Sequence, residues 1–180
     1  MPKIDIETRI RKGDRKKLLE IWDEITNPTA KSWTKGKGFE YLICKAFELE
    51  GANVEYPYNV IVRGTISEQI DGLISFGNIY CLIECKNQTD NVDFEPISKL
   101  RSRLQRRPSA AIGAIFTTAS FTEPALILNE YLHPQTILMW EKMEIFKCLE
   151  KGYFMEGLKK KYQYCIANGL TNYNLLVDLL

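Results

Sequence analysis

The two-residue segment Gly77-Asn78 most constrains the fold, because an apolar-rich run lies on each side of it. Glycine readily adopts the positive φ that two-residue hairpin loops require, and asparagine also tolerates it. The two runs begin near Ile66 and end at Lys86, where Asn87-Gln88 follows. This pattern predicts a β-hairpin with Gly77-Asn78 as its loop.

The loop also fixes which residues of the two strands face one another. Counting outward from Gly77-Asn78 gives the predicted pairs Phe76 with Ile79, Ile74 with Cys81, and Asp71 with Glu84. Directly opposed residues have Cβ atoms about 4.5–5.5 Å apart, and like charges there are destabilising. We therefore expect a divalent cation to offset the charges of Asp71 and Glu84. A loop one residue longer would move Asp71 out of this position.

Side chains alternate along a strand, so the same register predicts two different faces for the hairpin. One face is predicted to be apolar and comprises Ile70, Ile74, Phe76, Ile79, Cys81, Ile83 and Cys85. The opposite face gathers its functional groups at the end far from the loop. There Asp71 and Glu84 are joined by Gln69 and Lys86, which the register places opposite each other.

These residue types predict phosphodiester chemistry. Carboxylate oxygens suit Mg²⁺, which is commonly held by one or two carboxylates, several waters and a substrate phosphate; Mn²⁺ is an alternative ion. The backbone carbonyl of Cys85 could supply another oxygen. Lys86 could orient or deprotonate the attacking water, or stabilise charge that develops on the phosphate. A metal ion and a lysine beside a phosphodiester form a hydrolytic site.

The pattern resembles the PD-(D/E)xK nuclease superfamily, in its Mrr-like restriction endonuclease branch. Asp71 matches the first acid of the motif, and Glu84-Cys85-Lys86 matches its ExK element. Lys35–Glu40 resembles the upstream helix with its acidic residue, and Ala114–Thr122 resembles a core strand with the turn after it. Ile70 replaces the proline of the motif name. The resemblance extends from about Trp33 to Trp140.

This resemblance implies an α/β fold with a restriction-endonuclease-like mixed β-sheet flanked by helices. It implies a catalytic set of Asp71, Glu84 and Lys86, supported by Glu40 and Gln69, with Mg²⁺ as the cofactor and DNA as the substrate. We expect one domain over 1–180, with a nuclease-like core at 33–140. An N-terminal helix at 1–28 and a C-terminal helical extension at 141–180 would be additions to that core.

A basic segment between Pro96 and Ala110 contains five cationic residues and no acid: Lys99, Arg101, Arg103, Arg106 and Arg107. On a helix, all but Arg101 would lie on one face, where they could bind DNA phosphates. A solvated helix face is the other interpretation of the same pattern. Lys35 and Lys37 are further candidates for contact with DNA. The net charge of only +1 argues against strong general binding to nucleic acid.

The rest of the chain predicts helices and strands that would complete such a sheet. They are a helix over 5–25, a helix over 39–50, a strand over 54–62, a buried strand over 111–117, a short helix capped by Thr122, an edge strand over 136–140, and helices over 141–151 and 153–180. Tyrosines and leucines between Tyr162 and Leu179 would either pack on the core or form a homodimer surface.

Several classes of protein are disfavoured. No apolar run approaches the length of a membrane span, and the first residues lack the apolar region of a signal peptide, so we expect a cytoplasmic protein. The five cysteines include no CxxC pair and are expected to be buried thiols. A single histidine, His133, argues against a histidine-rich zinc site and a Ser-His-Asp hydrolase.

Three functions remain open at this point. The first is a metal-dependent deoxyribonuclease of a restriction or genome-defence type. The second is a nucleic-acid-binding module of the same fold with little or no cleavage. The third is a structural subunit in which Asp71 and Glu84 are exposed by accident of register. The facing acids followed by Lys86 favour the first, because a pure binder has no need of opposed carboxylates.

Overall fold

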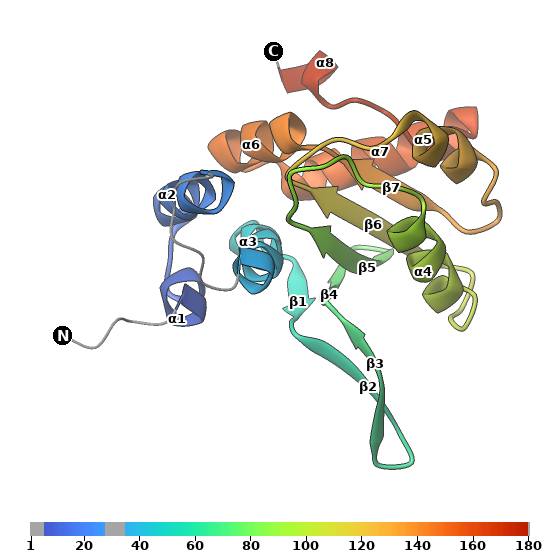
Figure 1. Cartoon of the computed structure of the whole chain (residues 1–180), viewed down its shortest axis with the longest axis horizontal. Coiled ribbons are helices and arrows are strands. Elements are labelled where there is room, and N and C mark those ends of the chain that lie inside the picture. Colours follow the sequence, from blue (N-terminus) through green and yellow to red (C-terminus); the bar gives the residue numbers. More distant parts are fainter. Residues whose placement is uncertain (1–5, 28–34, 180) are drawn as a thin grey trace.

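The computed structural model describes residues 6–27 and 35–179, which form a central sheet with helices on both faces (Figure 1). The sheet has five strands in the order β1-β4-β5-β6-β7. Their bounds are Asn53–Glu55 (β1), Gly72–Phe76 (β4), Ile79–Lys86 (β5), Ala111–Thr117 (β6) and Ile137–Trp140 (β7). β1, β4 and β5 pair antiparallel, whereas β5, β6 and β7 pair parallel. This mixed sheet confirms the predicted fold class.

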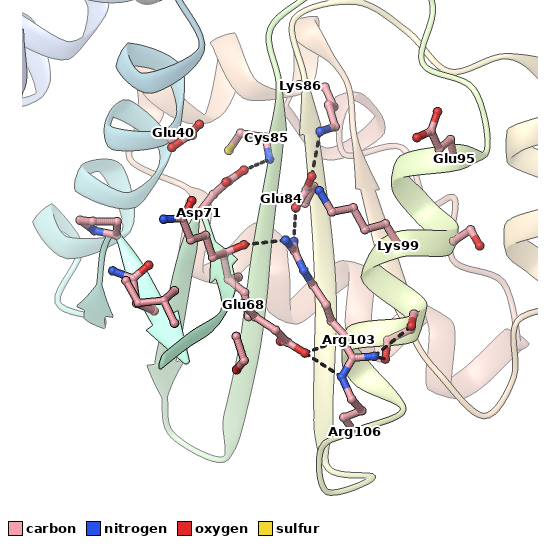
Figure 2. Close-up of a pocket in the computed structure, with 18 of the residues that line it drawn as sticks. Glu40, Glu68, Asp71, Glu84, Cys85, Lys86, Glu95, Lys99, Arg103 and Arg106 are labelled. Carbon is pink, nitrogen blue, oxygen red and sulfur yellow. Dashed lines mark hydrogen bonds and ion pairs between the residues drawn. The ribbon is translucent and has the colours of Figure 1, made fainter. Parts of the chain in front are cut away.

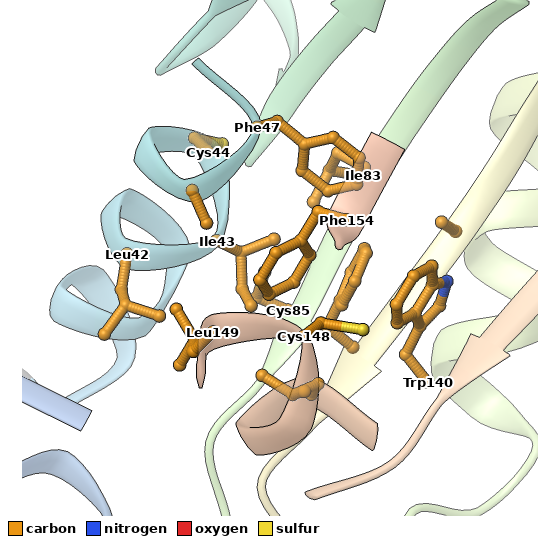
Figure 3. Packing of buried hydrophobic residues seen from close by; sticks show 14 of the residues in the cluster. Leu42, Ile43, Cys44, Phe47, Ile83, Cys85, Trp140, Cys148, Leu149 and Phe154 are labelled. Carbon is orange, nitrogen blue, oxygen red and sulfur yellow. The ribbon is translucent and has the colours of Figure 1, made fainter. Parts of the chain in front are cut away.

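The helices divide between the two faces of the sheet. One face is covered by α1 (Ile6–Arg11), α2 (Arg15–Thr26), α3 (Lys35–Leu49), α6 (Lys142–Lys151), α7 (Phe154–Asn168) and α8 (Leu176–Leu179). The other face is covered by α4 (Glu95–Leu104) and α5 (Glu123–Glu130). Figure 3 shows the core on the α3 side of the sheet, in which Phe47, Phe154 and Trp140 pack near β5. None of the described helices could span a membrane, being too short or too polar.

β5 lies in the middle of the sheet, so both of its faces are buried. Ile83 packs with the α3 side of the sheet, and Leu82 packs with the α4 side. Glu84 is buried on the same side as Leu82, although it is charged. A buried carboxylate must be paired or hydrogen-bonded, so this position already calls for cationic partners.

The hairpin register is confirmed, but the first predicted strand is broken. Phe76 pairs with Ile79 and Ile74 pairs with Cys81, as the loop predicts. The backbone then bends at Asp71, and β3 (Thr65–Ile70) pairs instead with β2 (Tyr58–Val62) in a separate two-stranded sheet.

This bend makes two expectations wrong. Gln69 pairs with Asn59 rather than lying opposite Lys86, and Ile70 packs in the α4-side core instead of the α3-side core. We refer to the two-stranded sheet, β2 and β3 together, as the arm. Figure 1 shows it projecting away from the body of the molecule.

Two other predicted elements are divided as well. The helix expected over 5–25 is α1 and α2, and Asp14 caps α2 by accepting a hydrogen bond from the Lys17 amide at 2.9 Å. The strand expected over 54–62 is β1 and β2, separated by Tyr56-Pro57. Proline cannot donate to a sheet hydrogen bond, which explains the break. Residues 1–5 and 28–34, part of the predicted N-terminal helix and Trp33, lie outside the described residues.

Two glycines allow helices to approach the sheet near the candidate site. A Cβ atom on Gly72 would lie 2.6 Å from the Cys44 sulfur of α3. A Cβ atom on Gly113 in β6 would lie 2.8 Å from Leu100 of α4. Because such distances are too short for carbon contacts, both positions require glycine for α3 and α4 to lie so close. The two helices therefore flank the end of β5 where Glu84 and Lys86 lie.

The C-terminal region follows the predicted order. β7 is an edge strand, and Thr122 caps α5 by accepting a hydrogen bond from the Ala125 amide at 3.3 Å. Leu175 and Leu179 are buried in the core, which favours packing over exposure for this part of the tail. All five cysteines are buried free thiols, as expected.

Candidate active site

An open cleft of about 1200 Å³ lies at the end of β5 far from the hairpin loop. Its walls are α4 on one side and the base of the arm on the other, and the first turns of α3 contribute to its rim (Figure 2). The predicted catalytic residues Asp71, Glu84 and Lys86 all line it, and so do Glu40 and Gln69. The structure thus brings together every residue of the predicted catalytic set.

Asp71 lies at the bend between the arm and β4, one residue before the Gly72–Ile83 pair. Its carboxylate accepts a hydrogen bond from the Cys85 amide at 2.6 Å, which holds it beside β5. Burial, followed by the negative charges of Glu84 and Glu40, raises the pKa of Asp71 to about 7. The local excess of negative charge is therefore incompletely neutralised by the protein.

Glu84 has a cationic partner on each carboxylate oxygen. Its side chain is only 4% exposed; Oε1 accepts from Lys86 Nζ at 2.8 Å, and Oε2 accepts from an Arg103 nitrogen at 2.5 Å. Two protein cations therefore already offset part of the charge of Glu84, beside the divalent cation that the sequence predicts. A carboxylate has about four acceptor positions, so these contacts leave room for further ligands.

Arg103 is buried and paired within the protein. It was predicted to face DNA phosphates, but it is 7% exposed and points into the cleft from α4. A second guanidinium nitrogen donates to the backbone carbonyl of Gln69 at 2.5 Å. Arg103 thus joins β5 to the base of the arm.

Lys86 extends from the last residue of β5 toward Glu84. Burial alone would lower the pKa of Lys86, but its hydrogen bond to Glu84 and the charges of Glu84 and Asp71 raise the pKa overall. The ammonium group is consequently protonated at neutral pH. In this state Lys86 can donate hydrogen bonds and stabilise negative charge, and it cannot accept a proton from water.

Glu40 contributes a third carboxylate at the rim, from α3. It lines the cleft together with Lys37, and the two side chains form an ion pair of 3.3 Å. Lys37, predicted to contact DNA, is 57% exposed and remains available to a ligand in the cleft. The Lys35 side chain is outside the described part of the chain.

The two arginines after α4 contact the arm. α4 ends at Leu104, so Arg106 and Arg107 do not continue its predicted basic face. Glu68 of β3 accepts from Arg106 Nε and from an Arg107 nitrogen, each at 2.6 Å. The role of Glu68 was not predicted from its residue type or position. Its only signal was that it is the one acid among the arm residues 58–70.

Lys99 is the remaining member of the predicted basic face. It extends from α4 into the cleft toward Glu84 (Figure 2). Within the described residues it forms no ion pair. Of the α4 residues proposed for DNA contact, Lys99 is therefore the one that keeps a free charge in the cleft.

Comparison with known proteins identifies the family. A family model, Mrr_cat, described as restriction endonuclease, matches residues 32–149. The chain belongs to this restriction endonuclease family. The matched range includes Glu40, Asp71, Glu84 and Lys86, and it confirms the resemblance drawn from the motif.

Solved structures are similar to this restriction endonuclease family member at low sequence identity. The small subunit R.BspD6I2 of the heterodimeric restriction endonuclease R.BspD6I is 13% identical, with a TM-score of 0.52 over 81% of this chain and 85% of that one. A protein of unknown function, AF1548, is 19% identical, with a TM-score of 0.48 over 73% and 77% of the two chains. The DNA modification-dependent restriction endonuclease AspBHI is 17% identical, with a TM-score of 0.44 over 77% of this chain and 35% of that one. No curated protein matches the sequence.

Proposed function

We propose that this restriction endonuclease family member is a metal-dependent DNA endonuclease that hydrolyses phosphodiester bonds, of a restriction or genome-defence type. The observation that supports it is the convergence of Asp71, Glu84 and Lys86 in one open cleft, within the range that matches the family. Two acids and a protonated lysine supply the groups that phosphodiester hydrolysis requires: a place for a cation and a donor for the phosphate.

The oxygen donors of the cleft fit a hard divalent cation such as Mg²⁺ or Mn²⁺. Asp71, Glu84 and the backbone carbonyl of Cys85 would hold it, as the sequence predicts. Burial and then the negative charges of Glu84 and Glu40 raise the pKa of Asp71, and a bound cation would offset both effects. Within residues 6–27 and 35–179, no three His, Cys, Asp or Glu side chains group to hold a metal. Waters and a phosphate would therefore complete the coordination, as is usual for Mg²⁺. When bound, the ion would activate water and neutralise charge on the phosphate.

The protein groups then have distinct tasks. Lys86, held by Glu84, would donate to the attacking water or to a phosphate oxygen. Glu40 and Gln69 line the same cleft and would support the catalytic residues from the edge of the site. Arg103 would keep the buried Glu84 carboxylate in place. Lys99 and Lys37 would contact phosphates that flank the bond to be cleaved.

The alternative, a DNA-binding module with little or no cleavage, is favoured by one observation. The contacts of Arg103 and Lys86 occupy one acceptor position on each oxygen of Glu84 and so reduce its negative charge. If these contacts persisted in the presence of metal, cation binding would be weak. Metal binding by the intact chain therefore separates the two functions.

The test combines cleavage with calorimetry. Supercoiled plasmid and single-stranded DNA are incubated with the chain in Mg²⁺, in Mn²⁺ and in chelator, and metal affinity is measured without DNA. We expect cleavage only with metal. Lys86→Ala should slow it by about 10²–10⁴-fold, the usual contribution of a positioned proton donor. Asp71→Asn should remove both cleavage and metal binding.

A matched control is Lys147→Ala, a half-buried lysine of α6 that is paired with Glu150 and whose loss should leave the cleavage rate unchanged. Cleavage that persists in chelator would refute the metal dependence. Full activity of Lys86→Ala would refute the role of the lysine. DNA binding without cleavage in either metal would support the binding module instead.

A further inference from the structure

The arm projects beside the active cleft, and its base forms one wall of that cleft. β3 leaves the main sheet at Asp71, the first acid of the motif, so the arm begins at the site itself. The six residues of β3 span about 20 Å at the usual rise of a strand. This reach is comparable with the width of a DNA duplex.

The base of the arm is fixed to the body of the protein. Glu68 is held by Arg106 and Arg107, and the Gln69 carbonyl is held by Arg103. Tyr58, Val60 and Ile70 also pack against the α4-side core. These contacts order the base of the arm, so the direction in which it projects is defined by the fold.

The outer half of the arm has an unusual surface for a solvated hairpin. Ile61, Val62 and Ile66 are 65%, 53% and 52% exposed. Arg63 lies at the tip, is exposed, and makes no ion pair with any described residue. Residues 59–67 contain this one cation and no acid. An apolar surface with a free arginine is compatible with a phosphate backbone and with base edges.

The position of the arm indicates which ligand would cover it. Asn59, Ile66 and Ser67 line the same cleft as Asp71 and Glu84. Val62 lines a second hollow, of about 630 Å³, on the arm beside Arg106 and Arg107. Ser67, Glu68 and Arg106 border both hollows, so the two spaces adjoin. A duplex with one phosphodiester bond beside Asp71 would therefore have the base of the arm next to it.

We propose that the arm is a DNA-contacting element whose outer half enters a groove of the duplex bound in the cleft. This inference rests on the proposed function. The major groove, about 12 Å wide, admits a two-stranded β-ribbon, and isoleucine side chains are among those that proteins insert between base steps. Ile61 and Ile66 would contact base edges or base steps, and Arg63 would contact a phosphate.

A second copy of this chain is the competing ligand for the arm, because exposed strand edges and apolar side chains also favour protein contacts. The duplex is favoured by the continuity of the arm with the cleft and by the absence of acids from residues 59–67. If the arm binds DNA, its variants should lose DNA affinity; if it binds a second copy of the chain, they should lose the dimer. One set of measurements therefore separates the two ligands.

The experiment uses the full chain in chelator, where cleavage does not occur, with a labelled duplex of about three helical turns. The arm variant is Ile61→Ser/Ile66→Ser, and the matched control is Ile166→Ser, an equally exposed isoleucine (68%) on α7. We expect the arm variant to bind the duplex about tenfold more weakly and the control to bind like the wild type. Arg63→Ala should lower the slope of log K against log salt by about 0.9.

Folding and assembly are measured on the same samples. Unchanged melting temperatures would show that the arm variant is folded, as expected for exposed side chains. Sedimentation reports the oligomeric state. A wild-type dimer that becomes monomeric in the arm variant, with unchanged DNA affinity, would overturn the proposal and assign the arm to a second copy. Equal binding by the arm variant and Ile166→Ser would overturn it as well.

Cleavage assays separate this proposal from the proposed function. A wild-type chain that binds DNA through the arm but never cleaves it would refute the nuclease assignment and support the arm. Metal-dependent cleavage with the same KM in the wild type and the arm variant would refute the arm alone. A raised KM with an unchanged kcat would support both. No binding to duplex DNA by the wild type would overturn the arm proposal.

Discussion

At the residue scale, Glu84 and Arg103 form a charge pair that is removed from water. Their side chains are 4% and 9% exposed, and the contact is 2.5 Å. Removing one member of a buried pair leaves the other charge uncompensated, which costs more than the pair contributes. Removal of Glu84 is therefore expected to lower the stability of the fold.

We therefore predict that Glu84→Met lowers the free energy of unfolding by about 3 kcal/mol in chelator. Glu84→Met/Arg103→Met should recover most of that loss, because the buried charge of Arg103 is removed together with that of its partner. Urea denaturation measures both. Glu48→Gln, which removes an exposed ion pair with Lys45, is the control and should cost less than about 1 kcal/mol. A double variant less stable than Glu84→Met would contradict the explanation.

Asp71 predicts a dependence of stability on pH. Its pKa is about 7 in the folded protein against an ordinary value of 3.8, so the folded state keeps a proton that the unfolded chain has lost. Between about pH 4 and pH 7, folding takes up this proton, and the free energy of unfolding falls as the pH rises. Above pH 7 the full cost of the buried charge is present.

Asp71→Asn removes this titration and keeps the size of the side chain. In chelator, the variant should be about as stable as the wild type near pH 4 and more stable by up to about 4 kcal/mol at pH 8. Denaturation curves at several pH values give the difference. Millimolar Mg²⁺ should stabilise the wild type at pH 8 and have little effect on the variant. Parallel curves for the two proteins would contradict the assignment.

At the scale of elements, the hairpin loop allowed a better prediction of strand pairing than the residue patterns of the strands did. Gly77-Asn78 fixed the register of β4 and β5, because the pairing of a tight hairpin is local. The departure of β3 at Asp71 was not predictable, since Glu68 is held by arginines 38 and 39 residues away. Those contacts require α4 to be packed on β6. For the same reason, the ion pair between Arg103 and Glu84 was not predicted from the sequence.

Some residues of the candidate site were predictable from the sequence and others were not. Asp71, Glu84 and Lys86 were predictable because strand alternation and the loop place them at one end of the hairpin. Gln69 was placed correctly in the cleft for the wrong reason, since it lies on the arm and not opposite Lys86. The basic residues of the α4 segment gave a pattern that a solvated helix, a phosphate-binding helix and an arm anchor all share.

We expect substitutions of the different cationic residues in the α4 segment to have different effects on DNA binding. Lys99 is free in the cleft, whereas Arg107 is held by Glu68. Lys99→Ala should lower the slope of log K against log salt by about 0.9, the contribution of one phosphate contact. Arg107→Ala should change the slope less and destabilise the base of the arm. Anisotropy titrations over a range of salt measure the slopes. Equal slopes in Lys99→Ala and the wild type would place the phosphate path elsewhere, with Lys37 as the next candidate.

At the scale of the whole molecule, a second buried charge pair joins α6 and α7, two helices of the C-terminal region. Lys161 of α7 is 1% exposed and donates to Glu144 of α6 at 2.7 Å and to the Tyr173 carbonyl. Glu144 also accepts from the Leu175 amide at 2.8 Å. Trp140 of β7 lies beneath the Lys161 ammonium at 5.3 Å. The lysine run at 159–161 is therefore partly structural, which its composition did not reveal.

Neighbouring lysines of this run give a matched pair of variants. Lys161→Met should lower the free energy of unfolding by about 3 kcal/mol, because Glu144 would stay buried without its cation. Lys159→Met, at a side chain that is 50% exposed, should change it by less than about 0.5 kcal/mol. Tryptophan fluorescence and circular dichroism should report one coincident transition in both variants, since Trp140 stacks on Phe116 and Phe154 within a single core. Separate transitions in Lys161→Met would instead show that α7 and the segment after it unfold independently of the nuclease sheet.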